Sequence, residues 1–174
     1  MGRSGKLWGF ENLGVTPDVF TSAKALGGGV PIGAMMARGE AATTFAPGDH
    51  ASTYGGNPLA CAAGLAVADE ISRKDLIKNA EERGNQLASS LRDLQKKHPN
   101  TISDVRGWGL LLGCELDAKF DHLAGEVVAK AMEKGLLLVP AGLKVVRFVP
   151  PLVVTEKEIE EAIDIFDAVL EELK

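Results

Sequence analysis

The segment T-S-A-K-A-L-G-G-G-V-P-I-G, residues 21–33, places one lysine, Lys24, between an apolar strand and a glycine-rich turn. The apolar runs at residues 18–22 and 32–37 predict two short strands, the first of them buried. Consecutive glycines at 27–29 let the backbone run close to a flat ligand. Because a lysine without a partner is costly to desolvate, this setting favours a lowered amine pKa and imine chemistry with a carbonyl group. The alternative is a strand-end lysine that points to water.

Two hydroxyl residues, Ser52 and Thr53, lie in the stretch H-A-S-T-Y-G-G, residues 50–56, immediately before a predicted helix. Asn57 is a good N-terminal helix cap, and the proline that follows it suits the first helical position. Hydroxyls beside the free N–H groups and the positive dipole end of a helix can form an anion site. The alternative is an ordinary helix entry without a ligand.

Arg147 interrupts an apolar strand, V-V-R-F-V, residues 145–149. A guanidinium in such a strand is costly unless it pairs with a carboxylate, which its planar fork can bind with two hydrogen bonds. The partner is either the carboxylate of a ligand or an acidic residue of the protein. Arg106, in a neighbouring predicted strand, is interpreted as structural.

The remaining pattern predicts helices at 58–72, 75–97 and 122–134, and a last helix that opens on a capping box at 155–158. Strands are expected at 101–106, 108–116, 136–139 and 144–149, with a glycine hinge at 107 and 109 and a turn at 140–142. The alanine-rich helix at 58–72 is apolar on nearly all sides, so we expect it to be packed on most of them. An α/β portion, residues 1–72, is thus followed by a small α+β domain, residues 73–174.

Composition excludes several classes of function. The chain has 174 residues, 45% of them hydrophobic and 25% charged, and a net charge of −5 that argues against nucleic acid as a partner. Its longest apolar runs are too short to cross a bilayer. The cysteines, Cys61 and Cys114, are expected to be buried apolar residues, which fits a reducing compartment such as the cytoplasm or an organelle matrix. No histidine spacing suggests zinc, and we expect no metal site.

Four stretches carry a resemblance to a known family: residues 2–35, 50–60, 105–113 and 145–154. The chain resembles class III pyridoxal-phosphate aminotransferases over nearly its whole length, and within that class it is most similar to the acetylornithine aminotransferase branch. The resemblance implies fold type I, with part of the large cofactor-binding domain followed by the small carboxy-terminal domain.

The resemblance also implies roles for individual residues. Lys24 would hold pyridoxal 5'-phosphate covalently and move the proton during catalysis. Thr53 would bind the cofactor phosphate, from the neighbouring subunit of a homodimer, and Ser52 would lie near the substrate. Arg147 would hold the carboxylate of the amino acid or of the 2-oxo acid.

The implied reaction is the transfer of the δ-amino group of N-acetylornithine to 2-oxoglutarate, a step of arginine biosynthesis. Ornithine or 4-aminobutyrate aminotransferases would share Lys24, Thr53 and Arg147, so they remain alternatives. A third possibility is a partner without catalytic activity that binds an intact homologue.

The chain departs from the family pattern at its beginning. The family has, upstream of the matching segment, an acidic partner of the pyridine nitrogen, a phosphate loop and an aromatic residue that stacks on the cofactor. We therefore expect Met1 to be an internal residue of a longer chain and this polypeptide alone to have little or no transaminase activity. Without the neighbouring strands, residues 2–37 should expose sheet edges and be packed less well than the second half.

Overall fold

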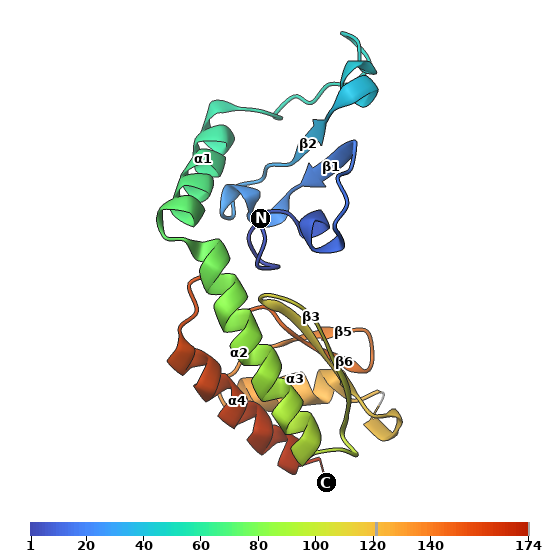
Figure 1. The fold of residues 1–174 in the computed structure, drawn as a ribbon, viewed down its shortest axis with the longest axis vertical. Helices are drawn as coiled ribbons and strands as arrows, with labels where there is room; N and C mark the ends of the chain where they lie inside the picture. Colours follow the sequence, from blue (N-terminus) through green and yellow to red (C-terminus); the bar gives the residue numbers. More distant parts are fainter. Residues whose placement is uncertain (121, 174) are drawn as a thin grey trace. The chain divides into compact units, whose positions relative to one another are not determined.

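The computed structural model describes residues 1–120 and 122–173. The chain divides into two compact units, and Figure 1 shows the elements of each. The first unit comprises Met1 and Leu7–Leu76, and the second comprises Gly2–Lys6 and Ile77–Lys174. None of the helices in the described residues is long and apolar enough to span a membrane.

The first unit is built around a two-stranded sheet and one long helix. In chain order its elements are η1 (Gly9–Leu13), β1 (Val19–Ser22), η2 (Lys24–Gly27), β2 (Ala34–Ala37), η3 (Gly39–Thr43) and α1 (Pro58–Arg73). Strands β1 and β2 are antiparallel, and their register pairs Val19 with Ala37 and Ser22 with Ala34. Phe20 of β1 packs against the rings of Trp8 at 4.9 Å and Phe10 at 5.2 Å between ring centroids.

The prediction that the strand before Lys24 is buried was wrong. Residues of β1 alternate between exposed and half-buried, and the side chain of Val19 is 45% exposed. A two-stranded sheet has a free edge on each strand, so its apolar residues find few neighbours. This agrees with the expectation that residues 2–37 are packed less well than the second half.

Helix α1 begins as predicted, because the side-chain oxygen of Asn57 accepts a hydrogen bond from the N–H of Ala60 at 3.0 Å. Its expected burial is wrong, since Leu59 is 75% and Leu65 is 67% exposed. Cys61 is also exposed, which corrects the prediction of a buried thiol. An apolar helix surface becomes buried only where another element covers it, and the described residues cover a single side of α1.

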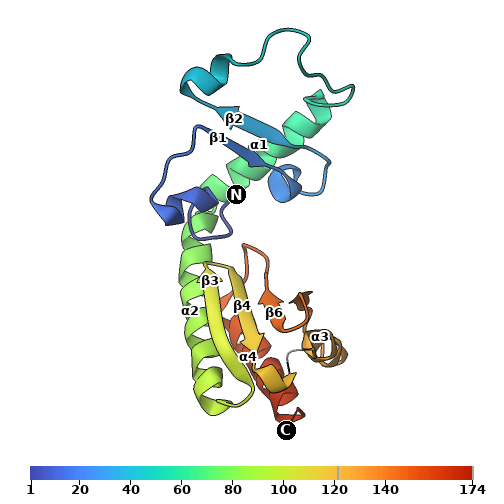
Figure 2. The ribbon, with the colours of Figure 1, turned by 90° about the vertical axis from the view of Figure 1, so that its right-hand side faces the viewer.

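The second unit is a four-stranded antiparallel sheet with helices on one face. Its elements are α2 (Leu76–Lys97), β3 (Ile102–Trp108), β4 (Leu111–Leu116), η4 (Ala118–Phe120), α3 (Ala124–Glu133), β5 (Val139–Ala141), β6 (Val145–Phe148) and α4 (Glu156–Glu171). The strand order is β3-β4-β6-β5. Figure 2 shows α2 and α4 behind the sheet, and the capping box of Thr155 and Glu158 starts α4 as predicted.

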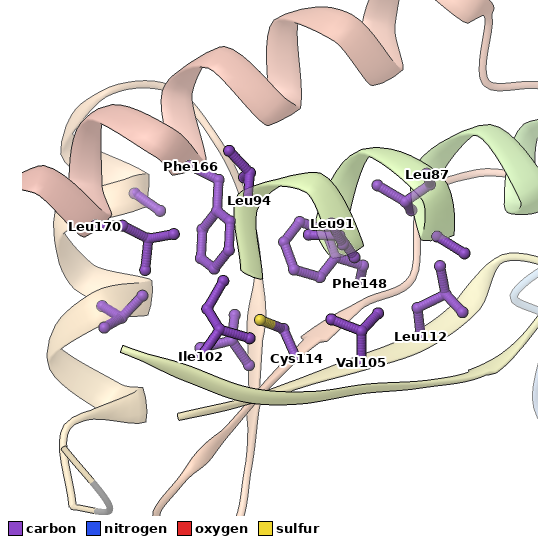
Figure 3. Packing of buried hydrophobic residues seen from close by; sticks show 14 of the residues in the cluster. Leu87, Leu91, Leu94, Ile102, Val105, Leu112, Cys114, Phe148, Phe166 and Leu170 are labelled. Atoms are coloured by element: carbon purple, nitrogen blue, oxygen red, sulfur yellow. The ribbon is translucent and has the colours of Figure 1, made fainter. Parts of the chain in front are cut away.

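The hydrophobic core lies between this sheet and its helices. Leu87, Leu91 and Leu94 point from α2 toward the buried residues of the strands, as Figure 3 shows. Every member of this cluster lies between Ala80 and Leu170, which are both in the second unit. Cys114 is buried here as expected, and burial raises the pKa of its thiol to about 12. This thiol is therefore protonated and unreactive near neutral pH.

Several strand boundaries differ from the predictions, among them the start of β4, which lies at Leu111 instead of residue 108. Strand β3 runs through Gly107 to Trp108, so the hinge is confined to Gly109 and Leu110. Strand β5 begins at Val139 instead of residue 136, and it includes Pro140, which we assigned to the turn. Proline lacks an N–H donor but is tolerated on an edge strand, and β5 is the edge of this sheet.

The first residues of the chain pack into the second unit. The guanidinium of Arg3 donates hydrogen bonds to the carbonyl oxygens of Leu110 at 3.0 Å and Pro150 at 2.7 Å. The N–H of Leu110 donates in return to the carbonyl of Arg3 at 2.8 Å. No local pattern in the sequence indicates these contacts, because the partners lie more than 100 positions away.

Candidate functional site

Lys24 follows β1 and is the first residue of the short helix η2. Its φ angle is +56°, a left-handed conformation that a side chain other than glycine, asparagine or aspartate adopts at a cost of about 1–2 kcal/mol per residue. The side chain is exposed, and none of the residues 1–120 and 122–173 forms an ion pair with it. The protein thus holds a free amine on a strained backbone, but the desolvation that we expected around it is not supplied by the described residues.

The glycine turn after Lys24 packs against the middle of α1. A Cβ atom added at Gly28 would lie 3.0 Å from Val67, and one at Gly64 would lie 3.6 Å from the carbonyl oxygen of Leu26. Gly28 also has a φ of +61°, which favours glycine. Small residues on both sides therefore fix the end of η2, and with it Lys24, on α1.

Ser52 and Thr53 lie in the exposed loop before α1. The hydroxyl oxygen of Ser52 accepts a hydrogen bond from the N–H of Gly55 at 3.0 Å, whereas the hydroxyl of Thr53 forms no hydrogen bond with described residues. Asn57 already accepts from the N–H groups of Ala60 and, through its carbonyl, Cys61. An anion would therefore be held chiefly by hydroxyls and loop N–H groups, and less by the helix end than we expected.

Lys24 and Thr53 approach α1 at different levels. Thr53 precedes the first turn, whereas η2 contacts Gly64 and Val67. At 1.5 Å per residue, Gly64 lies about 9 Å along the helix axis from Pro58. The first unit thus contains both residues without bringing them to the same end of the helix.

Arg147 lies in β6, in the second unit, on the sheet face opposite the core. The register places it between Gly113 of β4 and Val139 of β5, and Arg106 of β3 pairs with the other side of Gly113. The Nε atom of Arg147 is buried without a hydrogen-bond partner, and no carboxylate of the described chain forms an ion pair with this guanidinium. The alternative that Arg147 belongs to a structural salt bridge therefore finds no partner in this structure.

Arg106, by contrast, is neutralised by the protein, as the structural interpretation predicted. It donates to Asp104 at 2.8 Å and to Glu115 at 2.5 Å. Hydrogen bonds from Lys144 and Arg106 lower the pKa of Glu115 from its ordinary value. Of the two arginines on either side of Gly113, only Arg147 is left to bind an external carboxylate.

A pocket of about 680 Å³ opens over Arg147 on this face of the sheet. Its polar groups come from Arg106 and Arg147, and its walls are formed by Trp108, Leu111 and Val145 together with adjoining backbone. Such a volume is in the range of small-molecule sites. Sequence analysis missed Trp108, because only the pairing of Trp108 with Leu111 brings its ring to this pocket.

A second polar cluster joins the end of α2 to α4. The Nε2–H group of His98, which is buried, donates to Asp167 at 2.7 Å, and Lys97 donates to the other oxygen of this carboxylate at 2.6 Å. Together with Glu171 these groups lie close enough to hold a metal ion, but the ammonium of Lys97 already occupies the carboxylates. We interpret the cluster as a structural clamp. Sequence analysis missed it, although His98 continues the buried stripe of α2 four residues after Leu94.

We expect the Asp167→Ala variant to lose about 1–3 kcal/mol of unfolding free energy at pH 7, because the buried imidazole loses its acceptor. Burial opposes ionisation of Asp167, but hydrogen bonds from Lys97 and His98 outweigh it and lower the pKa. A lowered pKa stabilises the fold above the unfolded-state value and loses that effect as pH falls through the folded-state value. Urea denaturation should therefore show the deficit shrinking below about pH 4.

The control for this prediction is Asp93→Ala, which removes an exposed ion pair with Lys96 on the same helix. Exposed pairs contribute about 0–1 kcal/mol, so this variant should unfold close to the parent chain at every pH. Equal losses in the two variants would contradict the clamp.

Comparison with known proteins identifies the family of the chain. The profile of the family "Aminotransferase class-III" matches residues 1–170. The chain is 56% identical to the acetylornithine aminotransferase of Nostoc sp. over 98% of its own length and 40% of that protein. It superimposes on the acetylornithine aminotransferase of Elizabethkingia anophelis with a TM-score of 0.90 and 35% identity, covering 98% of this chain and 45% of that one.

An ornithine aminotransferase is equally similar in structure. The enzyme of Toxoplasma gondii, whose structure shows partial occupancy of pyridoxal phosphate at its active site, superimposes with a TM-score of 0.90 and 35% identity. This match covers 99% of the present chain and 42% of that protein.

The sequence predicted an α/β aminotransferase fold. The mixed α/β structure, the family profile and the structural relatives all agree with this fold class. The chain spans about 40% of the length of the curated relatives it matches. It belongs to the class III aminotransferases, a family of pyridoxal-phosphate-dependent enzymes.

Proposed function

We propose that this chain is part of an enzyme that transfers the δ-amino group of N-acetylornithine to 2-oxoglutarate, as in arginine biosynthesis. The observation that carries the proposal is that two cations predicted to act in catalysis, Lys24 and Arg147, both lack a carboxylate partner in the described residues. The match to acetylornithine aminotransferases at 56% identity supports the choice of substrate.

The residues around Lys24 fit pyridoxal 5'-phosphate as the cofactor. Lys24 offers an exposed primary amine for covalent attachment, and Gly28 and Gly29 leave the adjoining backbone free of side chains. When bound, the cofactor supplies an electron sink for the substrate carbanion. The amine of Lys24 would take a proton from the δ-carbon of the amino acid and deliver it later in the cycle.

Thr53 and Ser52 are proposed to serve the phosphate and the substrate of a second copy of the chain. The support is their position at the open end of α1, away from the turns that hold η2. The hydroxyl of Thr53 is exposed and can donate to a phosphate oxygen, and Ser52 is held in place by Gly55. We propose a homodimer in which each subunit completes the site of the other.

Arg147 binds the carboxylate at the unreactive end of the substrate. Its guanidinium can form two parallel hydrogen bonds with a carboxylate, and it lines the pocket on the open face of the sheet. We expect Arg147→Lys, in the complete enzyme, to lower kcat/KM for N-acetylornithine by about 10- to 100-fold, because an ammonium cannot reproduce the paired geometry. The matched control is Arg106→Lys, which alters a guanidinium that the protein already neutralises. Equal losses in both variants would contradict this role.

The function is tested by a substrate panel. Coupled assays of the complete enzyme from the source organism should show turnover with N-acetylornithine and 2-oxoglutarate that exceeds turnover with ornithine or 4-aminobutyrate. The 174-residue chain by itself should show no turnover above background, because the proposed partner of the pyridine nitrogen is not among its residues. A preference for ornithine or 4-aminobutyrate would assign one of those activities instead. If an intact homologue co-purifies with this chain and carries all of the activity, the chain is a partner without catalysis.

A further inference from the structure

Arg3 closes the open end of the pairing between β4 and β6. The register of these strands ends with Leu112 opposite Phe148. Two residues further on, the same register would place Leu110 opposite Pro150. Proline has no N–H group to donate, and the N–H of Leu110 donates to the carbonyl oxygen of Arg3 instead, at 2.8 Å. The guanidinium of Arg3 bridges this gap, because its Nη1 donates to the carbonyl oxygens of both Leu110, at 3.0 Å, and Pro150, at 2.7 Å.

This bridge is held from several sides. Arg3 is half-buried, and burial lowers the pKa of its guanidinium, which nevertheless stays charged. No carboxylate of the described residues forms an ion pair with it, so its donors are committed to backbone carbonyls. Hydrogen bonds from a charged donor are stronger than those between neutral groups. The backbone of Arg3 is fixed as well, since its carbonyl oxygen would lie only 2.6 Å from a Cβ atom added at Gly109.

Both ends of the bridge lie close in sequence to the elements that hold Arg147. Pro150 follows Arg147 by three residues, about 10 Å along an extended chain. Leu110 immediately precedes β4, whose Gly113 lies opposite Arg147. The Nε atom of Arg147 is buried without a hydrogen-bond partner, so the direction of its guanidinium depends on where β6 is held. The pocket over Arg147 is lined by strand residues, and Arg3 can act on it through those strands.

We propose that Arg3 is a positioning residue for Arg147: it fixes the end of β6 against the β3–β4 turn and so holds the guanidinium in the geometry that a substrate carboxylate requires. The inference rests on the proposed function, in which Arg147 binds that carboxylate. Two parallel hydrogen bonds tolerate little displacement of the donor group. Because Arg147 acts at the unreactive end of the substrate, loss of Arg3 weakens substrate binding and leaves the chemical step nearly unchanged.

The first test follows the Nε–H signal of Arg147 in ¹H–¹⁵N NMR of the 174-residue chain, without cofactor or substrate. This group is buried, which protects its proton from exchange with water, and its signal is assigned by its loss in Arg147→Lys. Arg3→Met keeps a long unbranched side chain but removes the donors, so we expect the signal to shift or broaden. Arg3→Lys retains a charged donor and should restore much of the parent position.

The matched control is Lys6→Met, which removes another cation of the same segment. Lys6 forms an exposed ion pair with Glu81 at 3.1 Å, and such pairs contribute little to the position of the backbone. The signal of Arg147 should therefore stay unchanged in this variant.

The second test measures kinetics of the complete enzyme. We expect Arg3→Met to raise KM for N-acetylornithine by about 10-fold while kcat stays within about twofold of the parent value. Added to Arg147→Lys, the same change should raise KM by less than about twofold, because both variants disturb one contact with the carboxylate. Lys6→Met should keep the KM of the parent enzyme.

Three results would each overturn the proposal: an Arg147 signal that does not respond to Arg3→Met, a KM that does not rise, or full additivity with Arg147→Lys. A residue that only stabilises the fold would affect activity equally with either side chain at position 147, which the double variant detects. If the substrate panel assigns another amino donor, KM is measured with that donor. If Arg147→Lys leaves kcat/KM unchanged, the proposed role of Arg147 fails, whereas the NMR test still decides whether Arg3 positions it.

Discussion

Replacing Lys24 by alanine in the complete enzyme will abolish covalent attachment of pyridoxal phosphate to the peptide that contains residue 24. It will also reduce turnover by about 10⁴-fold or more. The side chain is an exposed primary amine without an ion-pair partner in the described residues, held at the glycine turn. Reduction with borohydride followed by peptide mass spectrometry measures the attachment, and a coupled assay measures the turnover. Lys24→Arg should behave like the alanine variant, since a guanidinium is not a nucleophile at neutral pH.

The control lysine is Lys78, an exposed residue of α2 that faces Glu82 at 3.8 Å. Its alanine variant should retain both attachment and turnover, because Lys78 is a solvated surface cation. Attachment that persists in Lys24→Ala, or that is lost in both variants, would assign the reactive amine elsewhere.

Gly109→Ala should strongly destabilise the second unit. Gly109 has a φ of +52°, and an added Cβ would lie 2.5 Å from the carbonyl carbon of Ser4 and 2.6 Å from the carbonyl oxygen of Arg3. Left-handed strain and overpacking against backbone together cost about 2–5 kcal/mol. Urea denaturation of the 174-residue chain measures the loss.

Gly84→Ala tests the same contact from the other side. A Cβ at this buried position of α2 would lie 2.4 Å from the backbone of Gly109, so a loss of similar size is expected. The matched control is Gly125→Ala in α3, where the new methyl group meets nothing within 4 Å and should be neutral or stabilise by up to about 1 kcal/mol. If Gly109→Ala and Gly125→Ala unfold alike, the close packing of residues 3–5 on the turn does not contribute to stability.

Local patterns in the sequence determined the elements that depend on nearby residues. The cap at Asn57, the capping box at Thr155 and the apolar stripes of α2 and α4 were all predicted, because their partners lie within one or two helical turns. Lys24 was found in the same way, from the glycines that follow it. The family was evident from the sequence because its motifs are contiguous.

Only the tertiary structure decided which surfaces are covered and which charges are paired. Burial of α1 and β1 was overestimated, since apolar composition shows that a surface can be buried but not whether a neighbour covers it. Pairing across β3, β4 and β6 left Arg147 without a carboxylate while neutralising Arg106, although both look alike in sequence. The position of Trp108 beside Leu111 depends on strand register, and the close packing of Gly109 depends on residues 3–5, more than 100 positions away. Such contacts are set by the packing of the whole unit, and no local pattern records them.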